Sequence, residues 1–360
     1  MSTLFPVPAL IGGVTRPEDF VPSIVFGILY VGLIILAILR ICQRRSRTFA
    51  IFGATFFVFE RTLFFILRAT GAKLFWDSPY LTLYQQITLS LGYYGIANDI
   101  LMMHRCLLVN PTHGSETYGQ SPAARTKECE LTPPQFGEAD RPRERFWARR
   151  INDFVNFVLC VGIVFDIVAY WSYNTVLRDE SFTSRFYPSY LNGVDESRRR
   201  NFDFRQASAG VGLFGLVLVL ASLVWSFRTQ HRTSKRGTWI VGVTALLTCI
   251  VPIYRLSVMG TTNGAGESPY SILAPLNSPG SKAAFYILHI TPEWITSAIL
   301  LGLSIKKTFG TAAWGDTRYR DERPEETVRR ELQTAQREVQ RQIRTADPNT
   351  TNPPPQIQQR

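Results

Sequence analysis

Seven stretches of this chain are each long and apolar enough to cross a lipid bilayer, and this constrains the fold more than any other feature. A helix rises about 1.5 Å per residue, so a hydrocarbon layer of roughly 30 Å needs about 20 apolar residues. The predicted spans cover residues 22–40, 49–70, 83–103, 151–173, 207–227, 238–259 and 283–305. Their number and even spacing predict an all-α membrane protein, a seven-helix bundle folded as one domain.

The whole-chain averages conceal these spans. Hydrophobic residues make up 46% of the chain and the mean hydropathy is +0.01, because charged loops and a polar tail dilute the apolar segments. The cysteines do not indicate a disulfide framework, since none lies in a loop predicted to be outside. They are Cys42, Cys106, Cys129, Cys160 and Cys249.

The net charge of +11 is distributed unevenly between the loops. Most of the 39 Lys and Arg lie in residues 40–47, 104–150 and 228–236 and in the tail from residue 306 onward. Short basic loops remain in the cytosol, so the bias predicts the N-terminus out and the C-terminus in, with residues 1–21 as an extracytoplasmic segment. The plasma membrane is favoured over the endoplasmic reticulum or vacuole as the location.

Two polar regions are predicted on the cytosolic side. The loop 104–150 is rich in Pro, Ser, Thr and charge, which predicts disorder. Residues 324–346 are predicted to form a basic amphipathic helix, which either lies on anionic lipid, forms a dimerising coil or stands in solvent. Both regions are candidate binding sites for a cytosolic partner. The basic residues form no nucleic-acid motif, so the sequence predicts no nucleic-acid partner.

Charged residues inside the spans are the candidate functional site. A charge near the bilayer centre costs about 2.5–3.5 kcal/mol, so it normally faces the bundle interior and finds a partner. The candidates for ligand binding or ion coupling are Glu60, Arg61, Asp166, Arg255, His289 and Glu293. A secondary polar stripe in the third span consists of Gln86, Ser90, Tyr94, Asn98 and Asp99. Because these groups lie at similar predicted depth, they indicate a central polar cavity that leans outward.

A second interpretation is that the same charges form fixed ion pairs and bind nothing. Glu60 with Arg255, or Glu293 with Arg61, are the pairs considered. The spans hold four acids, Asp99 included, against three bases, Arg68 included, so one carboxyl is left without a basic partner. Pro252 and Pro292 lack an amide hydrogen and predict kinks in the last two spans.

Several classes of membrane protein are disfavoured. The third span ends in Met103-His104-Arg105 rather than Asp/Glu-Arg-Tyr, and the seventh has no Asn-Pro-x-x-Tyr, so rhodopsin-like receptors do not fit. The seventh span has no lysine for retinal before Lys306. No metal cluster, nucleophile elbow or phosphate-binding loop is present, which predicts neither an enzyme nor a cofactor.

Short motifs in three spans resemble a known family. They are Phe59-Glu60 followed by aromatics and Arg68, then Pro252-Ile253-Tyr254-Arg255, then Phe285-Tyr286 with His289 and Pro292. This pattern resembles the fungal seven-span family associated with resistance to 7-aminocholesterol, often described as lipid-translocating exporters. The chain departs from the family at Val258 and His289, where the family has acids, and Glu293 is displaced by one turn.

The resemblance implies a role in lipid asymmetry or in tolerance of amphiphilic toxins. Without an ATP-binding motif, movement of a lipid would be passive or coupled to an ion gradient, with the unpaired carboxyl as a candidate proton carrier. The first hypothesis is therefore a bundle that transports or senses an amphiphile, such as a membrane lipid or a sterol-like compound. The alternatives are a receptor-like sensor that signals through its cytosolic loop and tail, and a structural membrane protein without a ligand.

Overall fold

The computed structural model of this chain describes residues 9–43, 45–74, 79–180, 188–230, 232–260 and 275–316, with the single positions Leu332, Gln336 and Val339. At residues 79, 172–180 and 188–195 it describes the backbone alone. The chain divides into a unit Met1–Arg318 and a unit Tyr319–Arg360. The tail helix predicted over 324–346 lies outside the described residues except for those three positions, which are helical and exposed.

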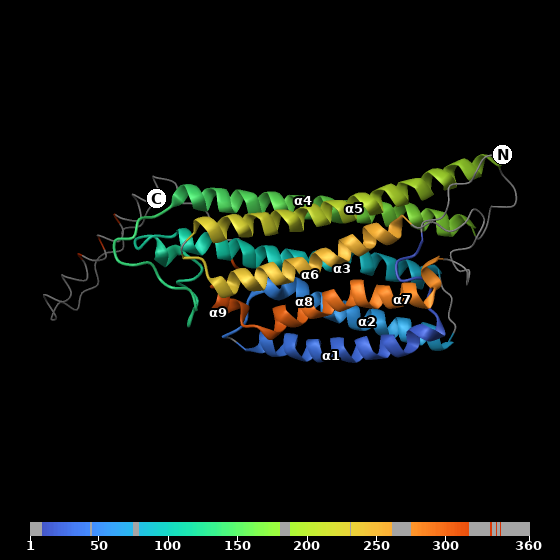
Figure 1. The fold of residues 1–360 in the computed structure, drawn as a ribbon, viewed down its shortest axis with the longest axis horizontal. Helices are drawn as coiled ribbons and strands as arrows, with labels where there is room; N and C mark the ends of the chain where they lie inside the picture. The colour runs from blue at the N-terminus through green and yellow to red at the C-terminus, as the bar shows by residue number, and fades with distance from the viewer. Residues whose placement is uncertain are drawn as a thin grey trace, which may run out of the picture. The chain divides into compact units, whose positions relative to one another are not determined.

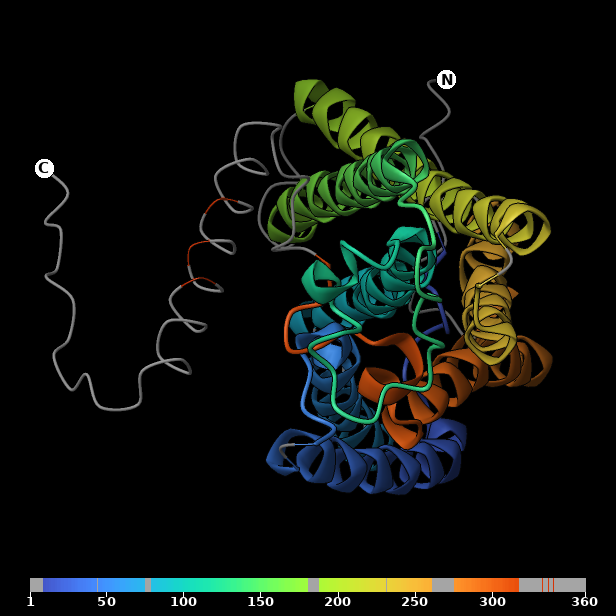
Figure 2. The same ribbon diagram turned by 90° about the vertical axis from the view of Figure 1, so that its left-hand side faces the viewer.

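Long helices lie side by side along the first unit (Figure 1). They are α1 (Phe20–Cys42), α2 (Phe52–Leu74), α3 (Pro79–Val109), α4 (Pro142–Glu180), α5 (Pro188–Thr229) and α6 (Lys235–Met259). A seventh rod consists of α7 (Pro279–Phe285), a π-helical turn (Tyr286–Ile290) and α8 (Thr291–Gly302), and the short α9 (Ile305–Phe309) follows. Helix α3 contacts α2, α4 and α6 and lies between them in the end-on view (Figure 2). No β-strand occurs among the described residues.

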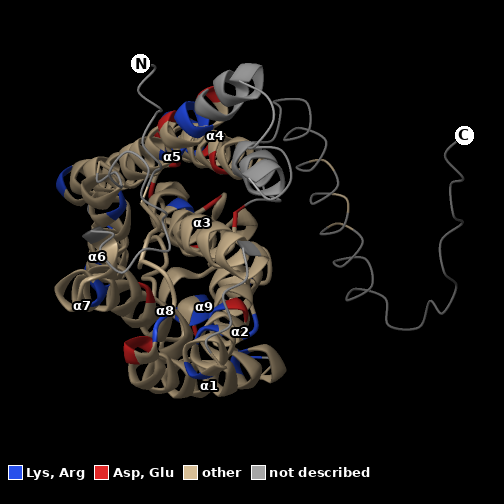
Figure 3. Ribbon diagram, turned by 90° about the vertical axis from the view of Figure 1, so that its right-hand side faces the viewer, with Lys and Arg blue, Asp and Glu red and all other residues tan. Residues whose placement is uncertain are grey.

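Six segments of this bundle are long and apolar enough to cross a membrane. They are Pro17–Cys42, Phe49–Leu74, Pro142–Trp171, Glu196–Thr229, Lys235–Met259 and Pro279–Gly302. Their apolar side chains also face outward: on α1, Val21 and Ile28 are 66% and 68% exposed, while Tyr30 is fully buried. Charged positions are few along the mostly uncharged ribbon (Figure 3). These features define an all-α, multi-pass membrane protein.

Helices α4 and α5 extend well beyond the predicted spans. They contain 39 and 42 residues, or about 58 and 63 Å at the rise of a helix, roughly twice the hydrocarbon thickness. The predicted spans 151–173 and 207–227 left residues 174–206 as a connection between them, but the described part of that connection continues the two helices. Hydropathy marks where a helix enters lipid, not where the helix ends. The two helices also contact each other, since Asn201 of α5 donates to the carbonyl of Ala169 of α4 at 2.7 Å.

The predicted disorder of residues 104–150 is also wrong. Residues at both ends of this segment belong to α3 and α4, and the part between them packs across the end of the bundle (Figure 2). Ser121 and Ala123 are buried, and the Glu130 amide donates to the Lys307 carbonyl at 3.0 Å. Composition missed this order because many partners of the loop's polar groups come from distant parts of the chain, such as the Lys307 carbonyl and the Arg232 side chain.

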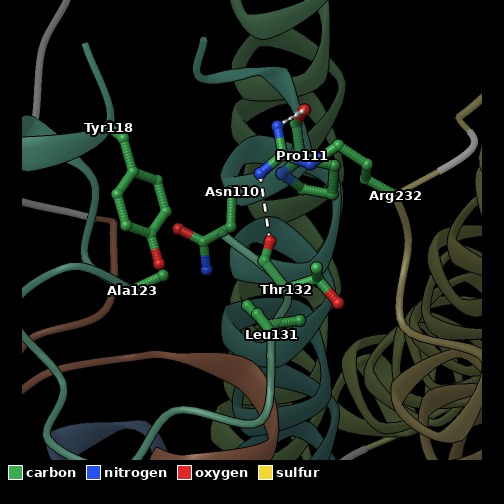
Figure 4. Close-up of a pocket in the computed structure, with 7 residues that line it drawn as sticks. All are labelled: Asn110, Pro111, Tyr118, Ala123, Leu131, Thr132 and Arg232. Carbon is green, nitrogen blue, oxygen red and sulfur yellow. Dashed lines mark hydrogen bonds between the residues drawn. The ribbon is translucent and has the colours of Figure 1, made fainter. Parts of the chain in front are cut away.

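The loop is anchored by an arginine from the turn between α5 and α6. Arg232 donates to the carbonyls of His113 at 3.0 Å and Thr132 at 3.1 Å, and to Glu138 at 3.2 Å. Figure 4 shows Arg232 beside Thr132 in a small polar hollow of the loop. One guanidinium thus holds both halves of the loop together, which uses the fixed fork of five N–H donors that arginine provides.

Candidate intramembrane binding site

The centre of the bundle holds an arginine shared by two carboxyl groups. Arg61 of α2 is fully buried and forms two parallel hydrogen bonds with Glu293 of α8, each 3.0 Å long. Its third nitrogen donates to Glu60 at 3.0 Å and to the carbonyl of Thr88 at 3.1 Å. A bidentate guanidinium–carboxylate pair is among the strongest polar contacts available in a protein interior. This cluster contains two carboxyl groups and one guanidinium.

Aromatic side chains enclose this cluster. The Arg61 guanidinium carbon lies 4.6 Å from the centre of the Phe57 ring, and Tyr84 donates to Glu60 at 3.3 Å. His289 is fully buried, stacks on Phe285 and lies 3.8 Å from the nearer oxygen of Glu293. That distance is too long for a hydrogen bond, so His289 packs beside the ion pair without bonding to it.

A second buried pair connects α6 with α4. Arg255 donates to Asp166 at 3.2 Å and to the carbonyl of Ser90 at 3.0 Å, and both charged side chains are fully buried. Arg61 and Arg255 thus bond to carbonyls only two residues apart on α3, at Thr88 and Ser90. Two residues of helix rise about 3 Å, so the two arginines lie at nearly the same level of the bundle, on different sides of α3.

A third buried cluster includes residues that the sequence analysis did not select. Arg68 contacts Asp19 at 3.2 Å and donates to the carbonyl of Gly12 at 2.8 Å. Lys282 also bonds to Asp19, and the Tyr286 hydroxyl donates to the same carboxylate at 3.2 Å. Asp19 and Lys282 lie at the ends of predicted spans, where charges are common, so no local signal distinguished them.

The polar stripe of α3 does not form one site. Gln86 bonds to the backbone of Ile11, and Tyr94 donates to the carbonyl of Ser208 at 2.8 Å. Asn98 is exposed, whereas the carboxylate of Asp99 accepts from the first amides of α2, at Gly53 and Ala54. These residues were predicted to share a cavity. They are mostly spaced four residues apart along α3, so they lie at different heights of the bundle and contact different neighbours.

The buried charges of α2, α4, α6 and α8 contact one another directly, as in the ion-pair interpretation. Of the two pairs considered there, Glu293 with Arg61 is present, while Glu60 bonds to Arg61 and Arg255 pairs with Asp166 instead. The predicted spans contain four acids, Glu60, Asp99, Asp166 and Glu293. Of these, Asp99 has no basic partner in the described part of the chain and accepts from backbone amides instead.

Two lateral clefts flank α3, and each has one carboxyl group in its wall. The cleft between α2 and α3 has a volume of about 310 Å³ and is lined by Phe56, Glu60, Thr88 and Leu91, among others. The cleft between α3 and α4 has a volume of about 280 Å³ and is lined by Leu91, Asp166 and Tyr170, with further apolar residues. Leu91 lines both clefts, so α3 is the wall between them.

The fold and the site define a class: a multi-pass α-helical membrane protein with paired charges buried at its centre. No family model, curated protein or solved structure matches the chain.

Proposed function

We propose that the protein is a seven-helix membrane protein that binds an amphiphile with a cationic head, through Glu60, in the cleft between α2 and α3. The observation that carries this proposal is the position of Glu60. Its side chain is 17% exposed, while its partner Arg61 and the other acid of the cluster, Glu293, are 0% and 1% exposed. Glu60 is thus the member of the cluster that a ligand in the cleft can reach.

The route of the chain supports counting α3 as a further span, which makes seven. The amide of Phe49, three residues before α2 begins, bonds to the carbonyl of Ala313. Arg149, near the start of α4, bonds to Asp316, three residues further on. Helices α2 and α4 therefore begin at the same end of the bundle, so the 31-residue α3 has to return the chain across it. Most of its polar stripe is buried against the rest of the bundle, at Gln86, Ser90, Tyr94 and Asp99.

The orientation proposal, with the N-terminus outside and the C-terminus in the cytosol, rests on the basic residues at that end. Arg45 and Arg236 are well exposed there, with side chains 84% and 61% accessible. Exposed Lys and Arg next to spans favour the cytosolic side. The location in the plasma membrane remains part of the same proposal.

The chemistry of the cleft favours a cation on an apolar body. Its other lining residues include Phe52, Phe56 and Leu91, which suit an acyl chain or a ring system. Since Arg61 already donates to both carboxyl groups, the cluster contains one carboxyl group more than its guanidinium balances. A ligand ammonium beside Glu60 supplies the second positive charge, and the low dielectric of the cleft strengthens that contact.

The test uses photoactivatable sphingosine, which carries an amine, and its N-acetyl derivative, which carries none. Purified protein in lipid nanodiscs is crosslinked with each probe, and labelling is mapped by mass spectrometry. We expect the amine probe to label α2 and α3, and Glu60→Gln to weaken it about tenfold, the equivalent of one lost charge contact of about 1.4 kcal/mol.

Glu18→Gln is the matched control, because Glu18 is an exposed acid outside the clefts. The variant should label like the wild type. Equal labelling by the amine and N-acetyl probes, or no loss in Glu60→Gln, would contradict the proposal.

Whether binding serves transport or sensing is a separate question with its own readout. The resemblance to lipid-translocating exporters favours transport, tested by reconstituting the protein in vesicles and measuring the flipping of a fluorescent lipid. The ordered loop favours the sensor, because it packs on the segment that follows α8. In a sensor, adding sphingosine changes hydrogen exchange of residues 110–141 while lipid flipping stays at the level of empty vesicles.

A further inference from the structure

Two residues that line the cleft between α3 and α4 have buried polar atoms that bond to nothing in the described part of the chain. Asp166 and Tyr170 both line the cleft, and their side chains are buried, with residue exposures of 0% and 5%. One carboxylate oxygen of Asp166, Oδ2, and the Tyr170 hydroxyl have no hydrogen-bond partner. A buried polar group without a partner costs about 1–3 kcal/mol, so such groups are normally satisfied by something.

Asp166 and Tyr170 lie one helical turn apart on α4, at positions i and i+4, and both line this cleft. The remaining lining is apolar and consists of Leu83, Ile87, Leu91, Ile167 and Trp171. A ligand that fits this lining is an apolar body with a small polar head placed at Asp166 and Tyr170.

The charges around the head position argue against a cation. The other oxygen of Asp166 already accepts from Arg255 at 3.2 Å, and Arg205 of α5 lies over the Tyr170 ring at 5.9 Å. The carboxyl group of Asp166 is thus already paired with one guanidinium, and a second guanidinium lies beside the Tyr170 ring, whereas at Glu60 two carboxyl groups share a single guanidinium. A hydroxyl head suits this site, since it donates to Asp166 Oδ2 and accepts from the Tyr170 hydroxyl.

We propose that the cleft between α3 and α4 is a second lipid site, which binds a neutral lipid through a single hydroxyl head at Asp166 and Tyr170. The site is separate from the Glu60 cleft, across α3, and goes beyond the function proposed above. A sterol and a diacylglycerol both have this chemistry, a hydroxyl on an apolar body.

The test measures binding of tritiated cholesterol and tritiated dioleoylglycerol to the purified protein in nanodiscs. The methyl ether of cholesterol, whose oxygen cannot donate, is the matched ligand. We expect saturable binding of at least one hydroxyl lipid, and at least a tenfold weaker binding of the ether. Binding of cholesterol or of dioleoylglycerol to the protein shows which class of lipid supplies the hydroxyl head, and either result supports the site.

Two variants locate the binding. Tyr170→Phe removes only the hydroxyl and should weaken the hydroxyl lipid about fivefold, as expected for one hydrogen bond. Ile167→Trp enlarges a lining side chain that is 52% exposed, so it fills the cleft without disturbing the core and should abolish binding. Ile28→Trp on the outer face of α1, where Ile28 is 68% exposed, is the matched control and should bind normally.

Binding that is unchanged in Ile167→Trp, or equal for cholesterol and its ether when dioleoylglycerol does not bind, would overturn the second site. The result is independent of the first proposal, because Ile167 lines only the α3–α4 cleft of the two and Glu60 lines only the other. Sphingosine labelling should therefore persist in Ile167→Trp, and hydroxyl-lipid binding should persist in Glu60→Gln.

Discussion

Arg61 of α2 and Glu293 of α8 face each other through two parallel hydrogen bonds, although 232 positions separate them in the chain. Both side chains are buried, so each is compensated mainly by the other. Glu60 shares the same guanidinium from the rim of the cleft. The three residues therefore have different roles: one pair stabilises the packing of α2 on α8, and one acid faces the cleft.

This division predicts unequal effects of removing the two acids. Glu293→Gln removes the bidentate partner of a fully buried arginine and should lower the free energy of unfolding by about 3–5 kcal/mol. Glu60→Gln leaves that pair intact and should cost less than about 1 kcal/mol. Thermal unfolding of both variants in the same detergent checks the difference, and equal losses would contradict these roles.

Asp99 is predicted to act as a helix cap supplied by a neighbouring helix. Its carboxylate accepts from the amides of Gly53 and Ala54 at 3.0 and 2.6 Å, where α2 begins. Replacing it with Ala leaves two amides without a partner and should destabilise the protein by about 2 kcal/mol. Asn98→Ala, at the exposed neighbouring position, is the control and should change the melting temperature little.

The close approach of α2 and α3 predicts that Gly53 does not tolerate a side chain. A Cβ at Gly53 would lie 2.3 Å from the carbonyl oxygen of Gly95, a backbone atom that cannot move aside. Gly53→Ala should therefore destabilise the protein by about 1–3 kcal/mol. Gly32→Ala is the matched helical control: its Cβ meets nothing within 4 Å, so the change should be neutral or stabilising, by up to about 1 kcal/mol.

The loop at the end of the bundle should loosen in mild acid because of His113. Burial, together with the positive charge of nearby Arg145, lowers the pKa of His113 from 6.5 to about 4. The unfolded chain takes up a proton near pH 6.5, whereas the folded protein resists it until about pH 4. The free energy of unfolding therefore falls as the pH falls through this window, by about 2 kcal/mol between pH 7 and pH 5.

The measurement is the difference in Tm between pH 7 and pH 5. We expect His113→Gln to show a smaller difference than the wild type, because glutamine takes up no proton in either state. Other groups that titrate in this window contribute equally to both proteins. An identical difference in the two would contradict the contribution of His113.

The apolar spans are a local property of the sequence, and they were sufficient to predict a helical membrane protein. Six of the seven expected spans correspond to helices with the length and composition to cross a bilayer. The remaining span, 83–103 in α3, stays a prediction that the route of the chain supports, because its polar stripe lowers its hydropathy. The ends of α4 and α5 were not predictable, since helix and hydrophobic span need not end together.

The sequence by itself determined which residues are too polar to face lipid, and among them it selected Glu60, Arg61, Asp166, Arg255 and Glu293. Only the tertiary structure decided their partners: Arg61 joins Glu60 to Glu293, Arg255 takes Asp166, and Asp99 caps α2. The physical reason is that the cost of burying a charge depends on the residue alone, whereas its compensation depends on the rotation and height of every neighbouring helix.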